Sequence, residues 1–223
     1  MALCLHQRLS AAMEAAQIPH RVNIHIVTDK AEILTNHSAV VRRCLYAALR
    51  RKDIRVHTGQ SVERISPDAV HAQDGFRLGA DATVIATQAS APGWLRDSGL
   101  ALDDAGFIRV NSRLQSVSDP RVFAAGDVAS FDPPLAKNGV YAVRQGPVLA
   151  ETLRAVQADT SPVAFSPQKR TLALISTGDR NAIASYGPLA VEGAWVWRMK
   201  DWIDQRWMDK YRVSNMDDTS EMS

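Results

Sequence analysis

The chain has 223 residues, of which 46% are hydrophobic and 22% charged, proportions typical of a soluble globular protein. Its formal net charge is +2 and its basic residues form no single run, so we expect no nucleic-acid partner. No apolar stretch approaches the roughly 20 residues of a membrane-spanning helix. Cys4 and Cys44 lie far apart and suit neither a disulfide framework nor a metal site, so we expect a cytoplasmic protein without a bound metal.

The first half of the chain alternates predicted helices and strands. Apolar residues at helical spacing predict a helix over residues 2–17, and the alternation in "VNIHIV" predicts a strand over 22–27. Ser38 can cap a second helix over 38–51, which "IRVHTG" follows as a short strand. Residues 62–86 then read as a meander of short strands, "VERI", "AVHA", "FRLG" and "ATVIAT". Helices and strands that alternate at this spacing indicate parallel pairing in an α/β sheet.

The second half continues with shorter elements. The segments "FIRVN" and "RVFAAGD" predict strands, and a glycine opens a predicted helix over 139–157. A linker rich in proline and serine follows, then strands at "TLALIST" and "NAIASYG". The last predicted element is a tryptophan-rich helix over 194–211, and we expect the polar tail at 213–223 to be disordered.

The segment "VFAAGDV" carries the strongest chemical signal. A strand that packs against a cofactor needs small residues, which Ala124, Ala125 and Gly126 supply. Asp127 follows at the carboxyl edge, where open α/β sheets bind ligands, and its carboxylate can accept hydrogen bonds from hydroxyl groups. The helix that begins near Gly139 would present free N–H groups to an acceptor-rich ring. The alternative is that Asp127 only caps a turn.

The longer segment "LQSVSDPRVFAAGDVA" resembles the second flavin-binding motif of the FAD-dependent pyridine nucleotide-disulfide oxidoreductase superfamily. Ser116, Phe123, Gly126 and Asp127 stand at the motif positions. The resemblance implies FAD as cofactor, with Asp127 on its ribityl chain. The carboxyl-terminal region resembles that of type II NADH dehydrogenases, including those sometimes fused to selenide, water dikinase.

The same resemblance implies further cofactor contacts. "AKNGVYAVRQGPVLAETL" is similar to the helix whose N-terminus faces the pyrimidine edge of the flavin, which places Asn138, Gly139 and Val140 there. Lys137 would put positive charge near the flavin N1 and O2 atoms, although a solvated loop lysine is the alternative. Asp29 could reach the ribose of NAD(P)H, although a turn-forming role is the alternative.

Gln145 resembles a glutamine of the family's flavin-facing helix, and we interpret it as a polar residue on a helix face.

The implied fold is α/β: a partial FAD/NAD(P)-binding three-layer fold, with a parallel sheet, helices and a β-meander, and a small α+β region at the carboxyl end. We expect an NAD(P)-binding domain over 1–88, part of an FAD-binding domain over 89–160, and a small domain over 161–212. Complete family members carry G-x-G-x-x-G turns for both nucleotides, and this sequence contains none. We therefore expect a carboxyl-terminal portion of such an enzyme, in which binding of FAD and NAD(P)H is weakened or lost.

The implied reaction is hydride transfer from NAD(P)H to FAD, followed by electron transfer to a quinone-like acceptor. Disulfide chemistry would need closely spaced cysteines, which Cys4 and Cys44 are not, so we assign no catalytic residue to this chain. The alternative function is that of an inactive truncated remnant, which acts only as a binding or dimerisation module.

The helix over 194–211 repeats apolar residues every three or four positions, among them Val196 and Ile203, with basic residues beside them. A helix of this kind can lie at the inner face of a membrane, as the resemblance also implies. The alternative is a stripe that packs on the domain or in a homodimer.

Overall fold

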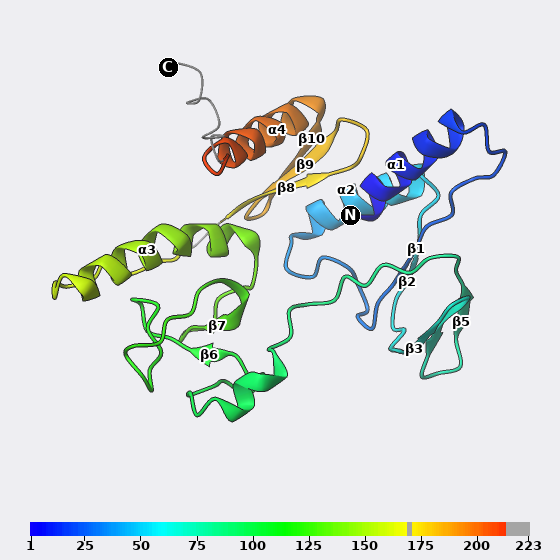
Figure 1. Cartoon of the computed structure of the whole chain (residues 1–223). Coiled ribbons are helices and arrows are strands. Elements are labelled where there is room, and N and C mark those ends of the chain that lie inside the picture. The colour runs from blue at the N-terminus through cyan, green and yellow to red at the C-terminus, as the bar shows by residue number, and fades with distance from the viewer. Residues whose placement is uncertain (169–170, 213–223) are drawn as a thin grey trace, which may run out of the picture. The chain divides into compact units, whose positions relative to one another are not determined.

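The computed structural model describes residues 1–168 and 171–212, which form two compact units (Figure 1). One unit combines residues 1–83 with 171–212, and the other holds residues 84–168. Helices, parallel strands and antiparallel strands are all present, so the α/β class predicted from the sequence is confirmed.

The first unit begins with two helices and a parallel strand pair. Helix α1 spans Ala2–Ala15 and α2 spans Ala39–Arg51, close to their predicted bounds. Strand β1, His25–Val27, pairs in parallel with β2, Arg55–His57. The predicted cap is confirmed, because the Ser38 hydroxyl accepts a hydrogen bond from the backbone N–H of Val41 at 3.4 Å.

The β-meander has three strands rather than the four predicted. Strands β3, Val62–Ser66, β4, Ala69–Ala72, and β5, Arg77–Gly79, pair in antiparallel order. The prediction of a strand at "ATVIAT" is wrong: residues 82–90 form no helix or strand, and Val84 and Ile85 are 59% and 70% exposed. The run is apolar enough for a strand, but no neighbouring strand among the described residues hydrogen-bonds to it.

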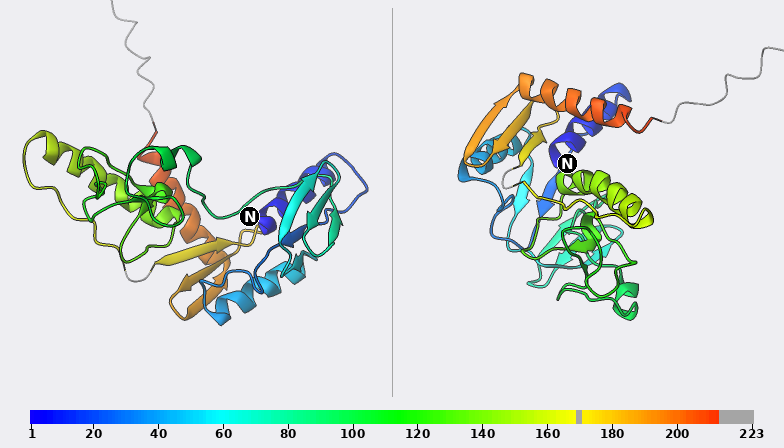
Figure 2. Two further views of the ribbon diagram at one scale, coloured as in Figure 1. Left: turned by 90° about the horizontal axis from the view of Figure 1, so that it is seen from below. Right: turned by 90° about the vertical axis from the view of Figure 1, so that its left-hand side faces the viewer.

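The carboxyl-terminal sheet completes this unit. Strands β8, Leu172–Ser176, β9, Ala182–Tyr186, and β10, Leu189–Gly193, form it, and the sequence reading missed β10. Helix α4, Ala194–Asp209, lies along the three strands (Figures 1 and 2). Ala182 and Ile183 are both fully buried although neighbouring strand residues point to opposite faces, so both faces are covered. Ile183 packs in one core cluster with α1 and α2 residues such as Leu3, Val41 and Leu45.

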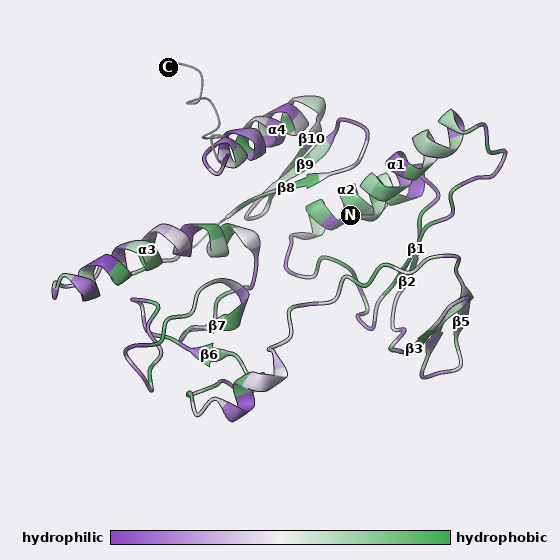
Figure 3. Ribbon diagram, in the orientation of Figure 1, coloured by the Kyte–Doolittle hydropathy of each residue, from purple (hydrophilic) through white to green (hydrophobic). Residues whose placement is uncertain are grey.

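Helix α4 is buried only near its start. Val196 is fully buried, whereas Trp195, Trp202 and Met208 are more than half exposed. Figure 3 shows apolar and polar residues alternating along this helix. No helix in the part of the chain that the structure describes is both long and apolar enough to cross a bilayer.

The second unit is built around a short strand pair and one long helix. Strand β6, Ile108–Arg109, pairs in parallel with β7, Ala129–Ser130, and α3 spans Gly139–Gln157, at its predicted bounds. The strand predicted over 121–127 is not formed as such. Only Phe123 bridges to a neighbour, Gln115, and the chain turns at Gly126–Val128 into a short 3-10 helix, η2, before β7. The core of the second unit contains Leu95 of another 3-10 helix, η1 (Gly93–Asp97). It also contains Ile108 of β6, Val110 directly after it, Ala124 before η2 and Ala129 of β7.

Two histidines of the first unit give a pH prediction. His25 Nδ1 and His57 Nε2 lie 2.9 Å apart across the β1–β2 pair, and burial, followed by the nearby His57 and Arg55, lowers the pKa of His25. At pH values just below the ordinary histidine pKa of about 6.5, the folded chain therefore binds fewer protons than the unfolded chain. We expect the free energy of unfolding to fall as the pH drops below about 7 and to change little from this group at higher pH.

Urea unfolding from pH 8 to pH 5.5 measures this effect. His25→Gln should flatten the pH dependence, whereas His20→Gln, at an exposed position before β1, should leave it unchanged. An equally steep decline in the His25 variant would contradict the prediction.

Candidate functional site

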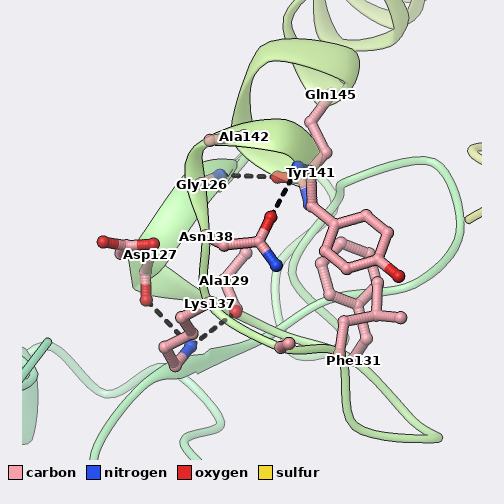
Figure 4. Close-up of a pocket in the computed structure, with 11 residues that line it drawn as sticks. Gly126, Asp127, Ala129, Phe131, Lys137, Asn138, Tyr141, Ala142 and Gln145 are labelled. Atoms are coloured by element: carbon pink, nitrogen blue, oxygen red, sulfur yellow. Dashed lines mark hydrogen bonds between the residues drawn. The ribbon is translucent and has the colours of Figure 1, made fainter. Parts of the chain in front are cut away.

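A pocket lies between the η2 turn, the loop after β7 and the start of α3 (Figure 4). Its lining combines small and apolar residues with the polar side chains of Asp127, Lys137, Asn138, Tyr141 and Gln145. Four of the residues predicted from the sequence to bind a cofactor thus line one pocket: Gly126, Asp127, Lys137 and Asn138. Gly139 and Val140 follow directly as the first residues of α3.

Gly126 has a backbone conformation that favours glycine. Its φ angle is +72°, and a Cβ atom built there would lie 3.6 Å from the Cβ of Ala142, an ordinary contact. The backbone conformation, rather than lack of space, is therefore what requires glycine at this position. Ala124 before it is buried, and Ala125 is extended. The run of small residues thus leads the chain into a tight turn against α3.

Gln145 holds this turn from the helix side. Its Oε1 atom accepts a hydrogen bond from the backbone N–H of Gly126 at 2.5 Å, and its side chain is only 2% exposed. The interpretation as a polar residue on a helix face missed this role. Gln145 lies three residues after Ala142, on the same helix face, so the approach of Ala142 to Gly126 also brings Gln145 there.

Lys137 holds the turn from the loop side. Its Nζ donates to the backbone carbonyls of Asp127 at 2.8 Å and Ala129 at 2.9 Å, and it lies 3.6 Å from the centre of the Phe107 ring. Burial lowers the pKa of Lys137, while Asp103 and Asp127 act in the opposite direction. The ammonium group is thus bonded to the protein backbone.

The start of α3 leaves hydrogen-bond donors free. The Asn138 side chain accepts from the Tyr141 N–H at 3.1 Å and so caps the helix. Among residues 1–168 and 171–212, nothing accepts a hydrogen bond from the N–H of Gly139 or Val140. Two backbone donors at the positive end of a 19-residue helix are therefore free to bind an acceptor.

The carboxylate of Asp127 is also free. It is exposed, and no described residue donates a hydrogen bond to it or forms a salt bridge with it, although it attracts the Lys137 ammonium group. Figure 4 shows it pointing away from Tyr141 and Phe131. Its role at a flavin and its alternative role as a turn cap both stay predictions.

Asp29 belongs to the other unit. It follows β1 in an exposed bend, and its Oδ2 atom accepts from Lys30 Nζ at 2.9 Å. The hydrogen bond from Lys30 lowers the pKa of the Asp29 carboxyl. Its role at a ribose, like that of a turn former, stays a prediction.

The groups around η2 fit a ligand that has hydroxyls and ring carbonyls. A free carboxylate at residue 127 suits hydroxyl donors, and the two free N–H groups of α3 suit a carbonyl acceptor. A flavin with a ribityl chain has both features. Among the described residues, no group of three or more His, Cys, Asp or Glu side chains could hold a metal ion.

Comparison with known proteins points to one family. The sequence profile of the family described as pyridine nucleotide-disulphide oxidoreductase matches residues 9–146. The chain is 40% identical to human apoptosis-inducing factor 3 over 96 residues, which are 39% of this chain and 15% of that protein. It is 30% identical to dihydrolipoyl dehydrogenase from Thermus scotoductus over 157 residues, 64% of this chain and 33% of that enzyme. The chain thus spans a third or less of these two relatives.

Solved structures share the fold. The sulfide:quinone oxidoreductase of Aquifex aeolicus superposes with a TM-score of 0.72 at 16% identity, over 95% of this chain and 54% of that one. An FAD-dependent pyridine nucleotide-disulphide oxidoreductase from Desulfovibrio vulgaris gives a TM-score of 0.58 at 26% identity, over 74% of this chain and 43% of that one.

Proposed function

Because the chain belongs to the pyridine nucleotide-disulphide oxidoreductase family, we propose that it serves an FAD-dependent NAD(P)H oxidoreductase reaction and binds the flavin at the η2 turn. When bound, FAD takes a hydride from NAD(P)H and passes electrons to a second acceptor. The observation that carries this proposal is that Asp127, whose carboxylate is free, lines a pocket at the start of α3, where the N–H groups of Gly139 and Val140 are also free.

The residues of the chain have separate tasks in this proposal. Asp127 accepts hydrogen bonds from the ribityl hydroxyls, and the N–H groups of Gly139 and Val140 donate to a carbonyl of the flavin ring. The positive end of α3 also stabilises negative charge on that side of the ring. Asn138 keeps the helix start in place, and Asp29 holds a ribose hydroxyl of NAD(P)H.

The acceptor in this proposal is quinone-like, and α4 is the surface that meets it. Trp195 and Trp202 are exposed on this helix, and the guanidinium of Arg206 lies 5.4 Å from the Trp202 ring centre. Exposed tryptophans beside basic residues suit the interface of a membrane, where quinones are found, or a homodimer contact. Cytoplasmic location with membrane contact at residues 194–211 is part of the same proposal.

A second candidate function is an inactive binding or dimerisation module. It is favoured by one feature of the sequence, because no G-x-G-x-x-G turn occurs among the 223 residues to cradle a pyrophosphate.

Reconstitution with FAD separates the two candidates. We expect the purified chain to retain FAD after gel filtration and to show flavin absorbance that NADH or NADPH bleaches. As a control, Asp104→Ala changes an exposed residue of the same unit and should behave like the wild type. A chain that stays colourless after incubation with FAD would contradict flavin binding and support the module. A yellow chain that neither nicotinamide nucleotide bleaches would contradict the hydride transfer alone.

A further inference from the structure

The η2 turn makes few hydrogen bonds of its own. It contains only Gly126–Val128, and the one bond that closes it runs from the Ala129 N–H to the Gly126 carbonyl. Side chains bind two further backbone groups of the turn and one directly after it: Gln145 binds the Gly126 N–H, and Lys137 binds the Asp127 carbonyl and the carbonyl of Ala129, which follows η2 (Figure 4). The shape of the turn therefore depends on two side chains that lie on either side of the α3 start.

The side chains of Gln145 and Lys137 are held in place by their contacts with the turn. Gln145 is almost completely buried, so loss of its hydrogen bond to the Gly126 N–H would leave a polar group without a partner and destabilise the turn. Lys137 is exposed, but its ammonium group donates to two carbonyls and lies on the Phe107 ring. These contacts hold both side chains against the turn.

The hydrogen bonds of Gln145 and Lys137 connect the turn that contains Asp127 to the start of α3. Asp127 is one of the three residues whose backbone groups are held and lies between the other two, Gly126 and Ala129. Gly139 and Val140 lie between Lys137 and Gln145 in the sequence. Holding the turn from both sides therefore fixes the Asp127 backbone relative to the free N–H groups of α3. A site whose groups are already in place loses less free energy to ordering when its ligand binds.

We propose that Gln145 and Lys137 are positioning residues, which hold the η2 turn so that Asp127 and the start of α3 face one flavin together. This inference rests on the proposed flavin binding and deepens it. Neither residue needs to touch the flavin, since each acts through the backbone of residues 126–129.

Titration of FAD into the flavin-free chain tests the proposal. Gln145→Met keeps the size of the side chain but removes the amide acceptor, and we expect it to weaken FAD binding about tenfold, as loss of one hydrogen bond to a partly buried N–H implies. Gln145→Glu keeps an acceptor oxygen and should restore most of the affinity. The matched control is Gln157→Met, at an exposed position near the end of the same helix, which should bind FAD as the wild type does. Lys137→Met should weaken binding in the same way as Gln145→Met.

Thermal unfolding of the flavin-free variants distinguishes positioning from general stability. A lowered melting temperature with unchanged FAD affinity would overturn the proposal, as would equal affinities of the wild type and Gln145→Met. In those cases the proposed function would stand, because the wild type would still bind flavin. A wild-type chain that binds no FAD would overturn the proposed function and this inference with it.

A measurement on the wild type alone covers the case in which a variant does not fold. Hydrogen exchange of the flavin-free chain, followed by NMR, should show slow exchange of the Gly126 amide, since Gln145 accepts from it in the folded turn. Exchange at the rate of an unprotected amide would overturn the proposal.

Discussion

Asp127→Ala is expected to weaken FAD binding about 100-fold. The carboxylate has no partner among the described residues, so in the proposed complex its full capacity as an acceptor goes to the ribityl hydroxyls. Hydrogen bonds to charged groups contribute about 1.5–3 kcal/mol each, and two of the weaker kind amount to about 3 kcal/mol, or about two orders of magnitude in the dissociation constant. Quenching of flavin fluorescence on titration into the flavin-free chain measures the change.

Two further variants sharpen the test. Asp127→Asn keeps one acceptor oxygen without the charge, and its affinity should fall between those of the wild type and the alanine variant. Asp104→Ala removes an exposed carboxylate elsewhere in the same unit and should change nothing. If Asp127→Ala binds FAD as tightly as the wild type does, the carboxylate is not a ligand of the flavin.

Gly178→Ala should produce the largest loss of stability. This glycine lies in the turn between β8 and β9, with φ of +89°, and an added Cβ would lie 2.4 Å from the backbone oxygen of Leu3. Leu3 belongs to the first turn of α1 and is 3% exposed, so its backbone cannot shift without disturbing the core. Overlap with a buried backbone, added to the unfavourable φ, implies a loss of about 3 kcal/mol or more in the free energy of unfolding. Urea unfolding measures it.

Gly75→Ala is the matched control for this prediction. Gly75 has a similar φ of +84°, but an added Cβ meets nothing within 4 Å. We expect it to cost only the backbone strain, about 1–2 kcal/mol. Equal losses at the two positions would show that α1 does not pack against the β8–β9 turn as described.

Several elements were predictable because their signals are local. Helix α2 begins after Ser38, whose hydroxyl caps it, and its apolar residues recur at helical spacing on the buried side. Helix α3 begins at Gly139 after the capping Asn138, and both its bounds match the prediction. Capping bonds and side-chain periodicity involve residues within a few positions of each other, so the sequence carries them directly.

The strands were less predictable, because a strand needs a partner. The apolar run at "ATVIAT" has none in the described chain and forms no strand, whereas β10 forms because β9 pairs with it. The approach to η2 has suitable residues for a strand, yet only Phe123 makes a bridge. Strand formation depends on backbone groups of distant segments, which the composition of one segment does not specify.

The sequence by itself determined the family motif, the glycine-aspartate turn and the helix start that follows it, since their spacing lies within about 25 consecutive residues of the printed chain. Only the tertiary structure decided that Gln145 and Lys137 bind the backbone of that turn, and that the carboxyl-terminal sheet packs against α2. The physical reason is that a side chain's partner depends on which backbone groups the folded chain brings within hydrogen-bonding distance. The sequence does not specify which backbone groups a polar residue on a helix or a lysine in a loop will bind. In the folded chain Ala142 packs against Gly126, and this contact places the Gln145 side chain at the Gly126 N–H.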